Sequence, residues 1–310
     1  MAFVHDDSKK ILLIGAGELG TAFLPHLQAL PKTYITLGIR TISKYTRLAS
    51  LNTSLLCLDI SGPSSGLSET FSKFDIVISC TGFGSEAGSV TKLANEILGA
   101  GRLRKEAGKG KLWFFPWQWG VDYDVTGDGE GLMPLFGEQV EVRNLLKGEA
   151  DEANVKWTIV STGIFMSFLF EQFWGIVDIQ GDGITVRALK DWEHQVTVTD
   201  VTDIGKVLAR IVAGDVESES RILYVAGDTV SYSQLADIVA RVTGKEVKRE
   251  EWSTSHLKEE LANDPDNLIK KYRVVFARDG VWWDKTLTVN HQLGIPVIDI
   301  ETYAKEHLIK

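Results

Sequence analysis

The chain has 310 residues, 44% of them hydrophobic and 24% charged, an ordinary composition for a soluble protein long enough to bury a full core. Its 33 Lys and Arg against 42 Asp and Glu give a net charge of -9, which argues against binding to nucleic acid or to an anionic membrane, because either partner requires a basic face. Cys57 and Cys80 are too few for a disulfide framework or a cysteine-rich zinc site, and we expect both thiols to be buried in strands.

Three further exclusions follow from the order of the residues. The six histidines are scattered without the spacing of metal ligands, so no metal site is predicted. The polar N-terminus lacks the apolar stretch of a signal peptide, and no run approaches the roughly 20 apolar residues of a membrane span. We therefore expect a cytoplasmic protein.

The first half of the chain alternates short apolar runs with helical patterns. Strands are predicted at residues 10–14, 34–39, 55–58, 75–80, 112–115 and 157–161. Helices are predicted at residues 19–30, 89–104 and 135–149. This alternation predicts βαβ units and therefore a doubly wound parallel Rossmann sheet of the α/β class, in which every strand ends at the edge where ligands bind.

The second half is less regular. Its patterns predict a capped helix after Thr199, a strand at residues 221–226 and an amphipathic helix at residues 231–242. We expect residues 1–162 to form the dinucleotide-binding domain and residues 163–310 to form a smaller α/β lobe for the substrate. Segments near residues 196–226 are expected to return to the first domain.

The strongest local motif follows the first predicted strand, where Gly15-x-Gly17-x-x-Gly20 leads directly into a helix. In dinucleotide-binding proteins the first glycine permits a tight turn, the second lets the backbone approach the pyrophosphate, and the third lets helix and strand pack closely. The helix N-terminus then offers N–H groups and a positive dipole to the phosphates. We therefore predict a dinucleotide site here, which includes Glu18 and Leu19.

The second predicted strand ends close to the expected adenosine ribose. An NAD-preferring site has Asp or Glu at this point, whereas this chain has Arg40 and Lys44 with two hydroxyl residues between them. A guanidinium and an ammonium suit a 2′-phosphate, which a carboxylate would repel. The predicted cofactor is therefore NADP(H).

Three more loops complete the predicted cofactor edge. The loop after the fourth strand has small residues where the backbone must pass the adenine and ribose. The loop after the fifth strand should lie beneath the nicotinamide, and the loop after the sixth should contact its carboxamide. The cofactor contacts predicted from these loops are Thr81, Gly82, Phe83, Pro116, Trp117, Gly163 and Phe165.

A Gly-x-Ser-x-Gly string occurs at residues 62–66 and matches the nucleophile elbow of hydrolases. Such an elbow needs a strand that runs directly into the turn and a helix that leaves it. The preceding strand is predicted to end at Leu58, and the string with Pro63 is predicted to be an ordinary loop. Hydrolase chemistry is therefore not expected.

With its glycine loop and strand edges in place, the chain resembles the NmrA-like, isoflavone-reductase-like branch of the atypical short-chain dehydrogenase-reductases over nearly its whole length. The resemblance rests on the glycine loop, Arg40, the Phe-Pro-x-x-x-Gly segment at 115–120, Thr158 and the following Gly163-x-Phe165. The stretch at 280–285 is similar to fungal members described as aromatic alcohol reductases. The resemblance implies an NADPH-binding Rossmann domain, a small substrate lobe and hydride transfer to phenolic or alkaloid secondary metabolites.

Two departures from the family pattern stand out. Ile14 replaces an extra glycine ahead of the glycine loop. The family's reductases also keep a lysine in a Phe-x-x-Lys-x-x-Val-Arg pattern, and here Gln139 stands in its place between Phe136 and Arg143. A carbonyl that accepts hydride becomes an oxyanion that needs a proton. The Gln139 amide donates a hydrogen bond but no proton at neutral pH. We expect Gln139 to line the cofactor and the catalytic centre.

Three interpretations of Gln139 stay open. In the first, another residue near the nicotinamide is the acid, with Tyr123, Asp122 and Glu138 as candidates. In the second, the substrate is an iminium or cyclic imine, which accepts hydride at carbon without forming an oxyanion. Coupling of the hydride transfer to a stereoselective cyclisation is an open alternative within this interpretation. In the third, the chain is an NADP(H)-binding redox sensor or regulator without catalytic activity.

The chain contains nine tryptophans, and aromatic residues gather in the expected substrate lobe. Aromatic faces favour a large, flat or cationic ligand, which a sensor would not need. The residues predicted to line the substrate are Trp119, Phe165, Phe168, Trp174 and Trp283. The predicted function is therefore an NADP(H)-dependent reduction of a bulky aromatic or alkaloid-type imine, iminium or carbonyl compound.

Overall fold

The computed structural model describes residues 8–82, 86–181 and 183–308, and the predicted cofactor contact Phe83 lies outside these ranges. The described chain divides into two compact units. The first contains the described residues up to Gln118, Glu141–Val160 and Gly205–Leu223. The second contains Trp119–Val140, Ser161–Ile204 and the described residues from Tyr224 onward. The expected domain boundary after residue 162 stays a prediction.

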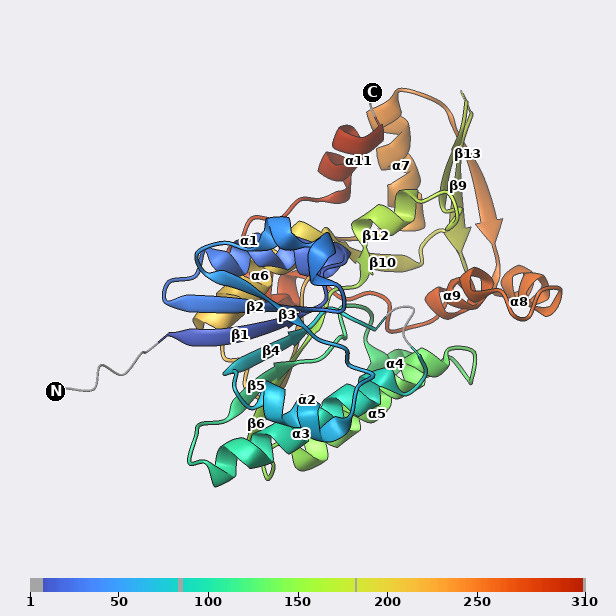
Figure 1. Cartoon of the computed structure of the whole chain (residues 1–310). Helices are drawn as coiled ribbons and strands as arrows, with labels where there is room; N and C mark the ends of the chain where they lie inside the picture. The colour runs from blue at the N-terminus through green and yellow to red at the C-terminus, as the bar shows by residue number, and fades with distance from the viewer. Residues whose placement is uncertain (1–7, 83–85, 182, 309–310) are drawn as a thin grey trace. The chain divides into compact units, whose positions relative to one another are not determined.

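The first unit is built on a seven-stranded sheet with the order β11-β6-β5-β4-β1-β2-β3 (Figure 1). Its strands are β1 (Lys9–Ile14), β2 (Thr33–Ile39), β3 (Thr53–Cys57), β4 (Ile76–Ser79), β5 (Leu112–Phe115), β6 (Val155–Ser161) and β11 (Arg221–Tyr224). The strands from β3 to β6 all pair in parallel. The sheet grows outward in both directions from β1 and β4, so the point where the strand order reverses lies between them. This confirms the predicted doubly wound Rossmann sheet.

Helices cover both faces of this sheet. Figure 1 shows α1 and α6 on one face and α2, α3 and α5 on the other. Their bounds are α1 (Glu18–Gln28), α2 (Ser64–Phe71), α3 (Ser89–Glu106), α5 (Pro134–Glu149) and α6 (Val201–Ala213), with short 3-10 turns η1 (Ile42–Lys44) and η2 (Thr46–Leu48) after β2. In α1, Leu19, Phe23 and Leu27 are buried at successive helical turns, which explains why this segment packs as a helix against the sheet.

The predicted elements of the first half are confirmed within about two residues of their ends, as expected for frayed termini. Two local predictions are wrong. Cys57 is exposed, because it ends β3 at the edge of the sheet. The Gly62–Gly66 string is not a loop, because α2 starts at Ser64 with Pro63 as its N-cap. Residues 58–63 still separate β3 from α2, so the geometry of a nucleophile elbow is absent from this described segment.

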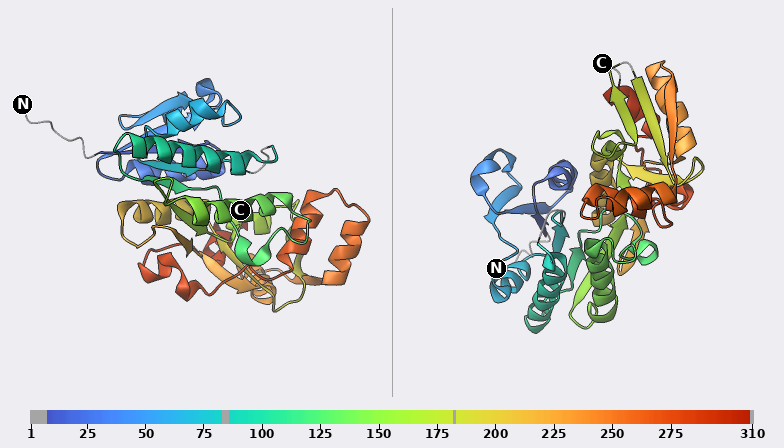
Figure 2. Two further views of the ribbon diagram at one scale, coloured as in Figure 1. Left: turned by 90° about the horizontal axis from the view of Figure 1, so that it is seen from below. Right: turned by 90° about the vertical axis from the view of Figure 1, so that its right-hand side faces the viewer.

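The second unit contains two three-stranded sheets, with the orders β12-β10-β7 and β13-β9-β8. Their strands are β7 (Ile164–Phe165), β8 (Val177–Gln180), β9 (Gly183–Leu189), β10 (Gln195–Thr199), β12 (Asp228–Ser231) and β13 (Val247–Trp252). The helical elements are α4 (Tyr123–Thr126), η3 (Met166–Phe170), α7 (Tyr232–Thr243), α8 (Thr254–Ala262), α9 (Leu268–Phe276), η4 (Lys285–Leu287), α10 (Val289–Gln292) and α11 (Ile300–Leu308). Figure 2 shows α7 beside the sheet of β9 and β13.

Two helices of the second half are set by their caps. In α6, Asp200 Oδ1 accepts a hydrogen bond from Thr202 N at 2.8 Å, which confirms the capped helix predicted after Thr199. In α7, Ser231 and Gln234 form a reciprocal capping box, and Gly244 ends the helix in the left-handed conformation at φ 65°. None of the helices in the described ranges is long and apolar enough to cross a membrane.

Candidate active site

The turn after β1 has one open side. Gly15 has φ +99°, and a Cβ added to it would lie 2.5 Å from Thr81 Cγ2, so the turn requires glycine there. A Cβ at Gly20 would overlap the carbonyl oxygen of Gly15, because helix and turn pack in direct contact. A Cβ at Gly17 would meet no atom within 4 Å. The backbone at Gly17 is therefore the part of this turn that a ligand can approach.

The start of α1 suits an anion. Gly17 is the N-cap of α1, and it has no side chain that could accept from the first N–H groups of the helix. These N–H groups point back along the helix axis toward the open side of the turn, and the helix dipole adds positive potential. A pyrophosphate fits this cradle in shape and in charge.

The carboxyl end of β2 carries exposed cationic side chains. Arg40 follows β2 directly, and Lys44 lies in η1 close behind it. The pKa of the Asp59 carboxyl is lowered, first by the hydrogen bonds from Ser61 and then by the positive charges of Arg40 and Lys92. Arg40 is exposed, and its guanidinium suits a phosphate.

An unsatisfied polar atom lies at the point where the strand order reverses. Thr81 follows β4 by two residues, and its methyl group packs against the turn at Gly15. Its Oγ1 is buried, and no described residue hydrogen-bonds to it. Since buried hydroxyl groups nearly always have partners, a polar group of a ligand would complete this position.

The segment after β5 displays an aromatic ring. Gln118 N donates to Pro116 O at 2.8 Å, which closes a tight turn around Trp117. The indole ring of Trp117 lies so close to Gly82 that a Cβ at Gly82 would overlap it. Arg143 Nε donates to Gln118 Oε1 at 2.7 Å, and both side chains are buried. This hydrogen bond joins the loop to a helix 25 residues later, so no local sequence pattern indicates it.

The acid candidates lie in the second unit with the following geometry. Tyr123 is buried, its ring packs edge-on against Phe136 at 4.9 Å, and its hydroxyl lies beside Gly120. Asp122 caps α4 through Asp124 N at 3.1 Å and accepts a hydrogen bond from Tyr224 Oη at 2.7 Å. Tyr224 was not predicted, and it is the last residue of β11.

Gln139 lies on α5, one turn before Arg143, and is only 1% exposed. Burial keeps bulk water away from this side chain, and an amide donates a hydrogen bond but no proton at neutral pH. Glu138 precedes it on the same helix. The catalytic roles predicted for Gln139, Tyr123, Asp122 and Glu138 stay predictions.

The segment after β6 is fixed to the segment after β5 within the second unit. Gly163 N and Thr162 N donate to Gly120 O at 3.0 and 2.9 Å. Gly163 has φ +70°, and a Cβ there would overlap the Thr197 carbonyl, so this position requires glycine. The tight turn leads directly into Phe165 in β7.

A row of three phenylalanine rings starts at this turn. Phe165 meets Phe168 edge-on at 6.2 Å, and Phe168 meets Phe173 edge-on at 5.6 Å. Phe173, which was not among the predicted substrate residues, is 49% exposed. The row therefore runs from a half-buried ring to an open aromatic surface.

The tryptophans predicted to line the substrate differ in their environment. Trp119 is 5% exposed and Trp174 only 1%, and the ring of Trp174 packs against Phe276 at 5.5 Å, so both rings belong to the interior of the second unit. Trp283 is half-buried and packs against Tyr224 at 5.0 Å. Counting aromatic residues in the sequence could not separate buried rings from rings that a ligand can reach.

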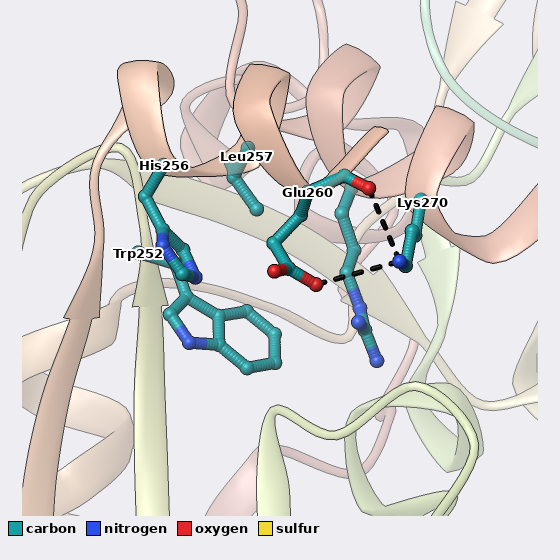
Figure 3. A pocket seen from close by; sticks show the side chains of 6 residues that line it. Trp252, His256, Leu257, Glu260 and Lys270 are labelled. Atoms are coloured by element: carbon teal, nitrogen blue, oxygen red, sulfur yellow. Dashed lines mark hydrogen bonds and ion pairs between the residues drawn. The ribbon is translucent and has the colours of Figure 1, made fainter. Parts of the chain in front are cut away.

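A small pocket elsewhere in the second unit was not predicted (Figure 3). Lys270 Nζ lies 3.4 Å from Glu260 Oε2 and donates to the Glu260 carbonyl at 3.1 Å, as drawn in Figure 3. Arg273 lies over the Trp252 ring at 4.6 Å, and burial lowers the pKa of its guanidinium. Lys270 is paired with Glu260, and the Arg273 guanidinium donates to the carbonyls of Phe173 and Trp174, so both cations have partners within the protein. Across the described residues, no three His, Cys, Asp or Glu side chains gather as metal ligands.

Comparison with known proteins gives consistent matches over nearly the whole chain. The family model described as the NmrA-like family matches residues 7–282. The NmrA-like family domain-containing oxidoreductase of Gibberella moniliformis is 35% identical over 98% of this chain and 100% of its own length. The crystal structure of isoflavone reductase superposes with a TM-score of 0.74 at 17% identity, covering 97% of this chain and 100% of that one. AtPrR2 with NADP+ and (+)pinoresinol superposes with a TM-score of 0.68 at 18% identity, covering 97% and 99%.

Proposed function

Because the chain belongs to the NmrA-like family, we propose that it is an NADP(H)-dependent oxidoreductase that reduces a bulky aromatic secondary metabolite. The observation that carries this proposal is the turn after β1, which is closed at Gly15 and Gly20 and open at Gly17. A turn packed in this way offers its backbone to a pyrophosphate. The names of similar proteins support it, since one is described as an oxidoreductase and another was solved with NADP+ and (+)pinoresinol.

The first unit holds the cofactor in this proposal. The backbone around Gly17 and the N-terminus of α1 bind the pyrophosphate, and Arg40 with Lys44 binds the 2′-phosphate. Thr81 Oγ1, to which no described residue hydrogen-bonds, gains a partner from the cofactor. When bound, NADPH supplies a hydride. The cofactor contacts predicted for Glu18, Leu19, Pro116, Gln139, Gly163 and Phe165 stay predictions.

The second unit supplies the aromatic surface for the substrate. Phe165, Phe168 and Phe173 form a continuous edge-to-face row with an exposed end, which suits a flat ring system. Trp119 and Trp174 support this unit from its interior. Trp283 keeps a place at the surface beside Tyr224.

We infer the chemical class of the substrate from Gln139, which stands where the family pattern has a lysine. A neutral, buried amide does not repel an iminium ion, whereas the ammonium of a lysine would. Hydride transfer to the carbon of an iminium also forms no oxyanion, so this reduction needs no proton donor. We therefore place an imine or iminium first among the substrates and a carbonyl compound second. Coupling of the hydride transfer to a stereoselective ring closure belongs to the same proposal, because a shaped pocket can fold a reactive imine.

NADPH consumption and product mass, followed with a panel of aromatic carbonyls, enones and cyclic imines, test this function. Turnover of cyclic imines is the expected result. Product without net loss of NADPH would indicate a cyclase that uses the cofactor catalytically. Tight binding of NADPH with no turnover across the panel would favour the alternative of a redox sensor, which the loss of the lysine also suggests.

Replacing Gln139 by lysine tests the substrate class directly. The new ammonium should lower turnover of a cationic imine by about tenfold, because like charges repel in a buried site, and should leave NADPH binding measurable. Steady-state rates with one imine and one ketone of similar shape measure the effect. Faster turnover of the ketone with Gln139→Lys would instead identify a carbonyl compound as the natural substrate.

A further inference from the structure

A fully buried arginine reaches the predicted cofactor loop. Arg143 has no exposed surface, and its Nε donates to Gln118 Oε1 at 2.7 Å. A buried guanidinium is costly unless its donors are satisfied, so the amide oxygen of Gln118 is held firmly in place. The charged donor also makes this a strong hydrogen bond.

The loop held by Arg143 has little freedom of its own. Gln118 N donates to Pro116 O, and the ring of Pro116 fixes its φ angle. Trp117 is the middle residue of this turn. With Gln118 tied at both its backbone and its side chain, the direction of the Trp117 side chain is set by its neighbours in the chain.

Trp117 meets the end of the neighbouring strand. The three atoms nearest to a Cβ built on Gly82 all belong to the Trp117 indole ring, and that Cβ would overlap them. Gly82 does not have a positive φ, so the ring and not the backbone conformation requires glycine at this position.

The position of this ring in the sheet points to one half of the cofactor. The pyrophosphate cradle follows β1, Arg40 follows β2 on one side of it, and Gly82 and Trp117 follow β4 and β5 on the other. A dinucleotide extends in opposite directions from its pyrophosphate. The side opposite Arg40 receives the nicotinamide half.

We infer that Arg143 is a positioning residue, which acts through Gln118 to hold the Trp117 ring against Gly82 as a wall for the nicotinamide half of NADP(H). This inference rests on the proposed function, because it needs the cofactor to bind. Arg143 does not contact the cofactor itself in this proposal, and Trp117 is the residue that touches it.

Direct binding of two ligands to the full chain tests the wall. NADPH carries both halves, whereas adenosine 2′,5′-bisphosphate carries the adenosine half alone. Gly82→Ala should raise the Kd for NADPH by about tenfold, as expected when an aromatic contact is lost, and should leave the Kd for the bisphosphate unchanged. In a Trp117→Ala background, Gly82→Ala should have no further effect on NADPH, because the ring that it displaces is gone.

The link through Arg143 is tested by Arg143→Lys and Gln118→Asn. Both variants weaken the contact between the residue 143 side chain and the residue 118 amide. In the same binding assay, both should raise the Kd for NADPH and leave the Kd for the bisphosphate unchanged. Arg104→Lys is the matched control, because Arg104 is a buried arginine of the same unit that donates to Gly110 O and Phe74 O. The control should lower Tm without changing the ratio of the two Kd values.

Each other outcome overturns the inference. NADPH binding that is unchanged in Gly82→Ala, or a Gly82→Ala effect that persists in Trp117→Ala, would refute the wall. Equal loss of both ligands in Arg143→Lys and Gln118→Asn would show a general structural role. If the unaltered protein binds neither ligand, the proposed function itself fails, whereas binding of both with no selective effect of any variant refutes this inference alone.

Discussion

The three glycines of the turn after β1 differ in which atoms an added methyl group would meet. Alanine substitutions there should therefore distinguish effects on cofactor binding from effects on stability. Gly17→Ala should leave Tm nearly unchanged, because no atom lies within 4 Å of the new Cβ, yet it should raise the Kd for NADPH at least about tenfold by blocking the pyrophosphate. Gly20→Ala should lower the free energy of unfolding by about 2 kcal/mol, because its Cβ overlaps the Gly15 carbonyl. Thermal melts and NADPH titrations of both variants measure the contrast; a large loss of Tm in Gly17→Ala would contradict it.

The proposed contact between Arg40 and the 2′-phosphate predicts a preference between the two nicotinamide cofactors. Arg40→Ala should raise the Kd for NADPH by about 10- to 100-fold, as expected for the loss of a charge-assisted phosphate contact. The Kd for NADH should barely change, because NADH has no 2′-phosphate. Lys9→Ala is a control for the loss of one positive charge in the same unit, since its ammonium donates to Val212 O. Titration of each variant with both cofactors measures the effect. Equal losses for NADPH and NADH would refute the assignment of the 2′-phosphate to Arg40.

At the scale of one element, α7 depends on its first turn. The Ser231 hydroxyl accepts from Gln234 N at 3.2 Å, and Gln234 Oε1 accepts from Ser231 N at 2.9 Å. Ser231→Ala should therefore reduce the free energy of unfolding by about 1 kcal/mol. Denaturant unfolding monitored by circular dichroism tests this, and Ser231→Thr should recover most of the loss. An unchanged midpoint in Ser231→Ala would show that packing alone holds the helix.

The elements whose signals are local could be predicted from the sequence, and the contacts that depend on topology could not. The glycine turn and the parallel strands follow from residue type and periodicity. Helix α2 was missed because it begins in a segment rich in Pro, Gly and Ser, which usually marks a loop. The hydrogen bond from Tyr224 to Asp122 joins residues 102 apart, so no local pattern indicates it.

The same limit applies to the candidate site. Gln139 was identified as a departure from a family pattern, but its burial follows from the packing of α5. Trp174 and Phe173 are adjacent in sequence, and only one of them is exposed. Composition indicates that an aromatic surface exists, whereas the fold selects which rings form it.

For the whole molecule, one buried histidine makes stability depend on pH. His194 is buried and its Nε2 lies 2.8 Å from Phe276 O. Burial, followed by the charge of Lys190, lowers its pKa from the usual 6.5, although the Phe276 carbonyl opposes this. Below about pH 6.5 the histidine of the unfolded chain binds a proton, whereas the buried histidine of the folded chain stays neutral. The free energy of unfolding therefore has its full value above about pH 6.5 and falls as the pH drops toward the lower pKa of the folded state.

We expect Tm to decline between about pH 7 and pH 5 and His194→Gln to flatten this decline. His291→Gln is the control, because His291 is exposed. Carboxylates affect stability only at lower pH. Hydrogen bonds from Arg241 and Lys305 lower the pKa of Glu301 from 4.5 to about 2, so the stability that ionised Glu301 contributes is lost as the pH falls from about 4.5 toward 2. An equal decline of Tm in His194→Gln and in the unaltered protein would refute the assignment to His194.

The order of β11 in the sheet has a consequence for synthesis on the ribosome. This strand pairs beside β6, yet it follows β6 in the chain only after a long stretch that belongs to the other unit. A nascent chain that has emerged only as far as Thr162 therefore carries β6 as an uncovered sheet edge, and such edges recruit other strands and promote aggregation. Expression of residues 1–162 alone should yield insoluble protein, whereas a shortened chain that rejoins Gly205–Leu223 to residues 1–162 would supply part of the missing strand and should stay in solution.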